Sequence, residues 1–416
     1  MIKSVLHTFI TKIFSAAFGF LTIIIVSRLL GAEGKGEQAM IVLNIYVLML
    51  LFTLLGNSTL VYLTPRFKFP LLIIPSLVWI MALGLVAVAI TILFPSVLPH
   101  YAAETIGIAV LASVTEVNQF VLLGKEKIRK ANRVKVLSPL ITCLLLVIMC
   151  LFNSLDTTAD FVLALGISYL FSTAYSVFVL RTDYAELTYN RLKTIPKRAF
   201  RQTTATMFAK GTTKQCGTII QTLNYRILFY FLAAYFGEKL VGIYSNAVSL
   251  SEAVMLFGSS LALVQYSRLS NLNRTDGEAV LMKRITLKMT AINAFYTVLA
   301  LLVLCIMPKG VYVWLLGADF ESVRYIIRLM AFGILCISCS SNFTQYFASR
   351  GNFTISAFAS LAGLLITLVF GVLLVPKYGI NGAAVTSVVS FAVTALTEGG
   401  FFVRWTRKDT GTQEVN

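Results

Sequence analysis

The sequence predicts an all-α integral membrane protein with about twelve transmembrane helices in two similar lobes. Hydrophobic residues make up 57% of the 416 residues, charged residues only 13%, and the mean hydropathy is +0.82. A soluble domain has about 25% charged residues, so this chain lacks the polar surface that water requires. Its apolar runs are long enough for helices of about twenty residues, and the ten-residue alternating strands of a membrane barrel are absent.

Turn residues separate the apolar runs and give the expected helices. Pro95 and Pro99 lie in one of these breaks, and Gly310 and Pro376 lie in two others, where they favour turns over continued helix. The expected helices are 7–30, 38–64, 70–94, 101–123, 134–153, 158–180, 205–235, 240–266, 286–307, 322–349, 353–375 and 379–403.

A pair of glycines five residues apart occurs at matching places in the two halves. Gly31 and Gly36 follow the first apolar run, and Gly237 and Gly242 follow the seventh. Because an even number of helices separates them, the halves have the same orientation, as in parallel repeats. We expect an N-terminal lobe of residues 1–180, a linker of 181–204, a second lobe of 205–403 and a tail of 404–416.

Basic residues concentrate in alternate loops, which predicts the orientation of the chain. Loops 65–69, 124–135, 181–204, 267–285 and 350–352 hold most of the Lys and Arg residues. Such loops stay in the cytoplasm, so both termini are expected there. This bias accounts for most of the net charge of +17 without a nucleic-acid partner.

Two helices at matching positions of the lobes carry a polar stripe. In the seventh helix the stripe consists of Lys210, Lys214, Gly217, Gln221 and Asn224, and in the first of Thr8, Lys12, Ser15, Gly19 and Thr22. These spacings place each set on one helical face. Because lipid does not tolerate such a face, we expect both stripes to line a shared cationic cavity. The alternative is that Lys12 and Lys210 extend to the cytoplasmic interface.

Three arginines within apolar runs are further candidates for binding an anion. Arg226 lies mid-helix but about 120° around the axis from Lys214, so pairing with an acid is an alternative role. Arg328 is one turn deeper than Arg324, and Arg28 lies near the outer end of the first helix. Charges that remain in membrane helices usually face a cavity or a partner.

Three acids, Glu116, Glu252 and Glu398, also fall within expected helices. A carboxylate there could bind a proton or sodium ion and couple it to transport. A salt bridge to a nearby Lys or Arg is the alternative, and for Glu398 exposure at the cytoplasmic end is another.

The sequence contains no recognisable catalytic or metal-binding motif. All six cysteines lie in apolar runs, where they are expected to be small core residues and not metal ligands. We therefore expect neither a cofactor nor an enzyme.

Several short motifs together resemble the Wzx-type polysaccharide exporters of the multidrug/oligosaccharidyl-lipid/polysaccharide (MOP) superfamily. The motifs are Ser27-Arg28-Leu29-Leu30-Gly31, Phe236-Gly237 through Ser245, Leu315-Leu316-Gly317-Ala318-Asp319-Phe320 and Tyr378-Gly379-Ile380-Asn381-Gly382-Ala383-Ala384. The resemblance spans the whole chain and implies a MATE/MOP-like fold of two six-helix lobes around a cavity.

The resemblance also implies a function and a location. Such a protein flips undecaprenyl-diphosphate-linked repeat units of O-antigen or another surface polysaccharide across the bacterial inner membrane by alternating access. Lys214 and then Lys12 are the expected ligands of the diphosphate, with hinges at Gly31 and Gly237. The implied partners are membrane lipid, H+ or Na+, a polysaccharide polymerase and a chain-length regulator.

Two other classes remain open. A cation-coupled multidrug antiporter of the same superfamily would favour an acidic, aromatic cavity, and the two stripes are basic. A membrane enzyme of glycan assembly would need substantial outer loops and a catalytic constellation, and the sequence shows neither.

Overall fold

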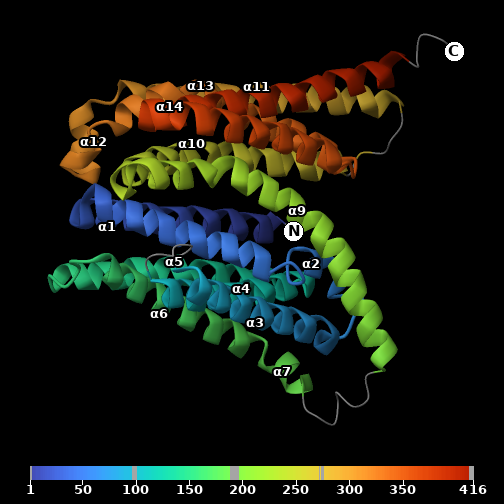
Figure 1. Ribbon diagram of the computed structural model, residues 1–416. Coiled ribbons are helices and arrows are strands. Elements are labelled where there is room, and N and C mark those ends of the chain that lie inside the picture. The colour runs from blue at the N-terminus through green and yellow to red at the C-terminus, as the bar shows by residue number, and fades with distance from the viewer. Residues whose placement is uncertain (1, 96–100, 188–195, 271, 273–275, 412–416) are drawn as a thin grey trace. The chain divides into compact units, whose positions relative to one another are not determined.

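The computed structural model describes the backbone of residues 2–95, 101–187, 196–270, 272 and 276–411 (Figure 1). Side chains are described for residues 10–95, 101–187, 196–212, 214–270, 272 and 280–407. The chain divides into two compact units, Met1–Ile219 and Ile220–Asn416. The boundary falls within the long helix α9 (Lys197–Phe236), whereas residues 188–195 of the expected linker lie outside the described residues.

Unit 1 consists of helices and short turns. Its helices are α1 (Ile2–Phe52), α2 (Thr59–Leu63), α3 (Phe69–Leu93), α4 (Ala102–Gly124), α5 (Ile128–Leu151), α6 (Thr158–Val179) and α7 (Arg181–Tyr184), followed by the 3₁₀ turn η2 (Ala185–Leu187) and the first part of α9. Residues such as Leu72, Val117 and Phe161 form its hydrophobic core.

Unit 2 begins within α9 and is also helical. It continues with α10 (Glu238–Ser270), α11 (Asp276–Ile306), α12 (Lys309–Leu316), η3 (Ala318–Phe320), α13 (Val323–Ser349) and α14 (Thr354–Gly411). Tyr346, Phe347 and Phe402 are buried in a core cluster of this unit.

Glycines in the left-handed region bend or end three of the helices. Gly31 (φ 66°) lies inside α1, Gly379 (φ 55°) lies inside α14, and Gly237 (φ 76°) follows the end of α9. Only glycine adopts this conformation without steric cost. The expected turn at residues 31–37 is therefore a single kinked residue, after which α1 resumes at once.

The helices confirm the all-α membrane class. Nine described helices are long and apolar enough to cross a membrane. Kinks at Gly31 and Gly379 divide two of the nine, and the 40-residue α9, which is less apolar, is a further segment. With α9 counted, the described residues form twelve long helical segments, the number expected from the sequence, but α9 is not among the helices apolar enough to cross a membrane.

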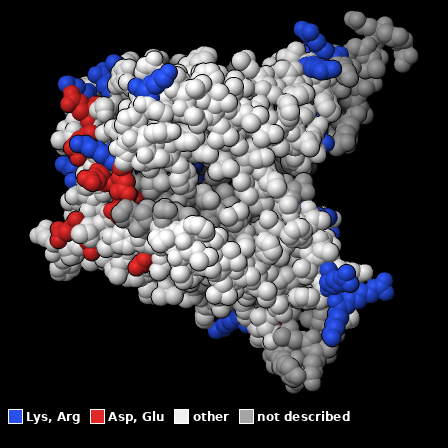
Figure 2. Space-filling view, in the orientation of Figure 1, with Lys and Arg blue, Asp and Glu red and all other residues white. Residues whose placement is uncertain are grey.

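The outer surface fits a bilayer. Leu85, Ile92, Leu151 and Leu396 are 72%, 73%, 75% and 74% exposed. On the face drawn in Figure 2, each unit carries its charged side chains at the helix ends, with an uncharged band between them. The protein is therefore a multi-pass membrane protein.

The second expected helix, 38–64, was too long. The structure ends α1 at Phe52, and a turn leads to the short α2. Asn57 stabilises that turn: its Oδ1 accepts a hydrogen bond from Thr59 N (2.9 Å), and its Nδ2 donates to Leu54 O (3.1 Å). An Asn side chain that bonds nearby backbone in this way competes with helix.

Candidate functional site

Helix α9 carries the lysines of the predicted stripe, and buried contacts fix it within unit 1. Asn57 Nδ2 donates to Gly211 O (3.0 Å), and Gln215 Nε2 donates to Leu50 O (2.5 Å). A Cβ added at Gly211 would meet Leu54 O at 2.3 Å, so only glycine allows this approach. These contacts hold one face of α9 against α1 and the turn that follows it.

The two lysines of α9 lie on its exposed side. Lys210 and Lys214 are both exposed, and the Lys210 ammonium lies 4.2 Å from the centre of the Tyr62 ring. Gly217 has open space where a Cβ would lie, and Gln221 is exposed, with its Nε2 3.5 Å from Tyr225 Oη. The structure therefore keeps four of the five stripe residues on an accessible face.

Asn224, the fifth stripe residue, belongs instead to a buried cluster in unit 2. It is 2% exposed, and its Oδ1 accepts hydrogen bonds from Thr367 Oγ1 (2.8 Å) and Ser390 Oγ (2.7 Å). Its Nδ2 lies 3.5 Å from Thr394 Oγ1. Asn224 therefore joins α9 to α14 through uncharged groups and does not line open space.

Two lysines and one acid of unit 1 lie close enough to interact electrostatically. Glu116 on α4 interacts electrostatically with Lys135 on α5, and Lys135 also interacts with Lys12 on α1. Lys12 and Glu116 are half-buried, and Lys135 is exposed. Among the described residues, neither lysine forms an ion pair with an acid within 4 Å.

In the sequence Lys135 lies where a basic loop meets an expected helix, and nothing in the sequence indicates its interaction with Glu116. Helix α5 begins at Ile128, several residues before the expected start, so Lys135 lies two turns inside it. Of the other unit 1 candidates, Ser15 and Thr22 are half-buried, and Arg28 is exposed.

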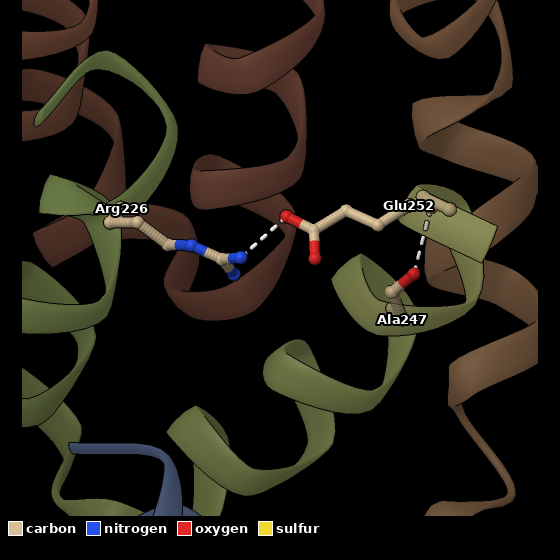
Figure 3. A network of polar contacts seen from close by, with 4 residues as sticks. Arg226, Ala247 and Glu252 are labelled. Atoms are coloured by element: carbon tan, nitrogen blue, oxygen red, sulfur yellow. Dashed lines mark hydrogen bonds and ion pairs between the residues drawn. The ribbon is translucent and has the colours of Figure 1, made fainter. Parts of the chain in front are cut away.

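In unit 2 the predicted cation and acid pair with each other. Arg226 Nη2 lies 2.5 Å from Glu252 Oε1, and the two side chains are 26% and 45% exposed. Figure 3 shows the side chains pointing toward one another from α9 and α10. The Arg226 guanidinium also lies 5.5 Å from the centre of the Phe229 ring. Pairing with an acid, the alternative considered for both residues, is therefore the arrangement in this structure.

Glu398 on α14 is 2% exposed, which rules out exposure at the cytoplasmic end. Ser340 Oγ and Thr344 Oγ1, both from α13, donate hydrogen bonds to its carboxylate, the latter at 2.9 Å to each oxygen. No Lys or Arg among the described residues pairs with it. A carboxylate among hydroxyl groups can take up a small cation or a proton. A hydroxyl group can donate a hydrogen bond to the charged carboxylate and can accept one from the protonated form.

Arg328 lies near the N-terminal end of α13, in a charged pocket of unit 2 with a volume of about 600 Å³. Its Nε and Nη2 donate to Cys305 O at 2.9 and 2.7 Å, and Arg324 Nε donates to the same oxygen at 3.3 Å. Lys309 and Glu321, which also line the pocket, form an exposed ion pair at 2.5 Å. Because both guanidinium groups bind the end of α11, their first role is to hold that helix end.

The part of the chain that the structure describes contains no group of three His, Cys, Asp or Glu side chains that could hold a metal ion. Its six cysteines are all free.

Comparison with known proteins gives one relative in sequence and several in structure. No family model matches the chain. The capsular polysaccharide biosynthesis protein CapF of Staphylococcus aureus is 26% identical over 183 residues, which are 44% of this chain and 46% of that protein. The match thus spans about half the length of this curated relative.

Solved structures match almost the whole chain. An inward-facing multidrug resistance MATE transporter of the MOP superfamily has a TM-score of 0.74 at 14% identity, covering 97% of this chain and 96% of its own. The lipid II flippase MurJ in an inward closed conformation has a TM-score of 0.71 at 14% identity, covering 95% and 87%.

A MOP superfamily transporter from Pyrococcus furiosus, described as having a binding pocket of reverse polarity, has a TM-score of 0.66 at 14% identity and covers 98% and 96%. All three matched structures are membrane transport proteins. The chain therefore has the MATE/MOP fold that the sequence predicted.

Proposed function

We propose that the protein is a flippase, not an enzyme, and that it moves a lipid-linked oligosaccharide across the membrane by alternating access. One observation carries the proposal. Lys12, Lys135, Lys210 and Lys214 in unit 1 lie in or beside membrane helices, and none forms an ion pair with a described residue. Unpaired cations at such positions are costly unless they serve a ligand.

The substrate that fits these lysines is an anionic glycolipid such as undecaprenyl-diphosphate-linked oligosaccharide. Its diphosphate would bind the ammonium groups through charge-assisted hydrogen bonds. Its sugars would contact polar residues such as Gln221, Ser15 and Thr22, and its hydrocarbon tail would stay in lipid. CapF, a capsular polysaccharide biosynthesis protein, supports a role in surface glycan assembly such as O-antigen export.

The orientation and the partners belong to the same proposal. Both termini lie in the cytoplasm of a bacterium and the substrate leaves the inner leaflet of its inner membrane, as the basic loops suggest. A polysaccharide polymerase and a chain-length regulator act on the product.

Reconstituted protein offers the direct test. Liposomes with purified protein receive a fluorescent polyprenyl-diphosphate glycan, and outer-leaflet arrival is followed with a membrane-impermeant quencher. We expect transport by the native protein and at least a ~10-fold loss with Lys214→Ala, from removal of one charge-assisted contact. Arg129→Ala, an exposed basic residue at the start of α5, serves as the control. Equal transport by both variants would remove Lys214 from the site.

A multidrug antiporter is the second candidate, because buried Glu398 and the fold of a MATE transporter suit cation exchange. The same liposomes loaded with labelled organic cations decide between the two. Cation movement without glycolipid movement would replace the flippase proposal.

Glu398 is the proposed ion-coupling residue in either case, with Glu116 and Glu252 less suited because each already faces a cation. In liposomes, the native protein should respond to an imposed proton or sodium gradient. Glu398→Gln, which keeps the shape of the side chain, should abolish that response.

A further inference from the structure

Unit 2 contains a long groove between α13 and α14 with a volume of about 1000 Å³. On each helix the lining residues recur every three or four positions and so form one face. They are Phe332, Leu335, Cys336, Cys339 and Phe343 on α13, and Ala392, Ala395, Leu396, Gly399, Gly400, Val403, Arg404 and Arg407 on α14. Apart from the two arginines, every lining residue is apolar, small or a thiol.

Glycine on α14 keeps this groove open. A Cβ added at Gly400 would meet no atom within 4 Å, so the space beside it is empty. A Cβ at Gly399 would contact only the Phe343 ring, at 3.7 Å. At the rim, Phe332 is 62% and Leu396 is 74% exposed. In a membrane these side chains face lipid, so the groove is accessible from the hydrocarbon of the bilayer.

The groove is charged at one end only. Arg404 directly follows the apolar wall, and Arg407 lies about one turn beyond it, near the C-terminal end of α14. Arg404 is exposed and forms no hydrogen bond or ion pair with a described residue. From Ala392 to Val403 the wall is roughly 17 Å long at 1.5 Å per residue, which is close to half of a ~30 Å hydrocarbon core.

We propose that this groove binds one acyl chain of an anionic phospholipid whose phosphate contacts Arg404 and Arg407. The apolar wall matches a hydrocarbon chain in length and character, and the arginines lie at the level where a lipid phosphate would be. Basic residues at the membrane surface recognise anionic lipids in this way, and a guanidinium can donate two hydrogen bonds to one phosphate. None of the lysines in the proposed flippase site takes part, so the two proposals fail independently.

Lipid binding to the purified full-length protein tests the proposal. Native mass spectrometry in detergent measures the affinity for added phosphatidylglycerol and for phosphatidylcholine, which has no net charge. We expect Arg404→Gln with Arg407→Gln to weaken phosphatidylglycerol binding ~10-fold or more, through loss of charge-assisted contacts. Arg129→Gln with Lys130→Gln, two exposed basic residues of α5, is the matched control and should change it less than ~2-fold.

A second pair of variants tests the apolar wall. Gly400→Leu starts from a Cβ position with no atom within 4 Å, so it should place its side chain in the groove and expel the acyl chain, which weakens binding by a similar factor. Gly107→Leu on α4 is the control, because that exposed glycine also has open space around its Cβ position.

Three results would overturn the proposal. The first is equal phosphatidylglycerol binding by the arginine variant and its control. The second is equal affinity for phosphatidylcholine. The third is displacement of phosphatidylglycerol by stoichiometric undecaprenyl diphosphate, which would make the transported lipid the occupant.

Discussion

The two units differ in how they treat charge inside the membrane, although both are helical bundles. In unit 2 Arg226 has a carboxylate partner at 2.5 Å, and the remaining acid, Glu398, is enclosed by hydroxyl groups. In unit 1 Lys12 and Lys135 interact electrostatically with one another, and a single acid, Glu116, interacts with Lys135. The lysines of α9 up to residue 219 add to the positive side.

This difference indicates a division of roles between the units. A membrane helix retains an unpaired cation only if a ligand or a cavity lowers its cost, which favours unit 1 as the part that binds an anionic substrate. In unit 2 the Arg226–Glu252 pair balances one cation, and Glu398 lies among hydroxyl groups with no described Lys or Arg paired to it, which suits ion coupling. The predictions that follow test this comparison, from the largest expected effect to the smallest.

Charge reversal in unit 1 should have the largest effect. Lys214→Glu places an acid where the diphosphate is proposed to bind, and like charges repel by several kcal/mol when close and poorly solvated. We expect a loss of transport of ~100-fold or more in the liposome assay, against about twofold for Arg129→Glu at the N-terminal end of α5. Retention of full transport by Lys214→Glu would show that unit 1 does not bind the anion through this lysine.

In unit 2 the expected effect is on stability, because removing one partner of the ion pair leaves the other charge uncompensated. Arg226→Ala or Glu252→Ala alone leaves one charge without its partner, and each should lower stability in detergent by about 1–3 kcal/mol, less than a fully buried pair because both groups are partly exposed. The double variant should be more stable than the sum of the single changes predicts. A thermal unfolding cycle of the four proteins measures this coupling, and strict additivity would contradict it.

Close packing of α9 in unit 1 should give an intermediate effect. Gly211→Ala brings a Cβ within 2.3 Å of Leu54 O, whereas Gly217→Ala on the same helix meets no atom within 4 Å. Overpacking of this kind costs about 1–3 kcal/mol. Thermal unfolding should therefore show a lower Tm for Gly211→Ala and an unchanged or higher Tm for Gly217→Ala. Equal Tm values would mean that α9 shifts freely against α1.

These cases show what the sequence could and could not predict. Hydropathy predicted the helices because membrane spans are set by length and composition. Helical spacing correctly grouped Lys210, Lys214 and Gln221, because residues seven or eleven apart share a face. It placed Asn224 on the same face, yet Asn224 lies in the α14 cluster, since the choice among neighbouring helices depends on tertiary packing. The Arg226–Glu252 pair and the Glu116–Lys135 interaction each join separate helices, and one sequence contains no signal for such contacts.

Alanine substitutions at the kinks of Gly31 and Gly379 should have the smallest effect. Because one kink lies in each unit, they also allow the two units to be compared. Each glycine has positive φ, at 66° and 55°, inside a membrane helix. Alanine at either position would be strained by about 1–2 kcal/mol, because its Cβ approaches the following carbonyl oxygen. If both kinks are structural only, the two variants should lower the Tm by similar amounts and leave transport per folded molecule unchanged. If Gly31 is the hinge that alternating access requires, Gly31→Ala should slow transport several-fold beyond its effect on Tm.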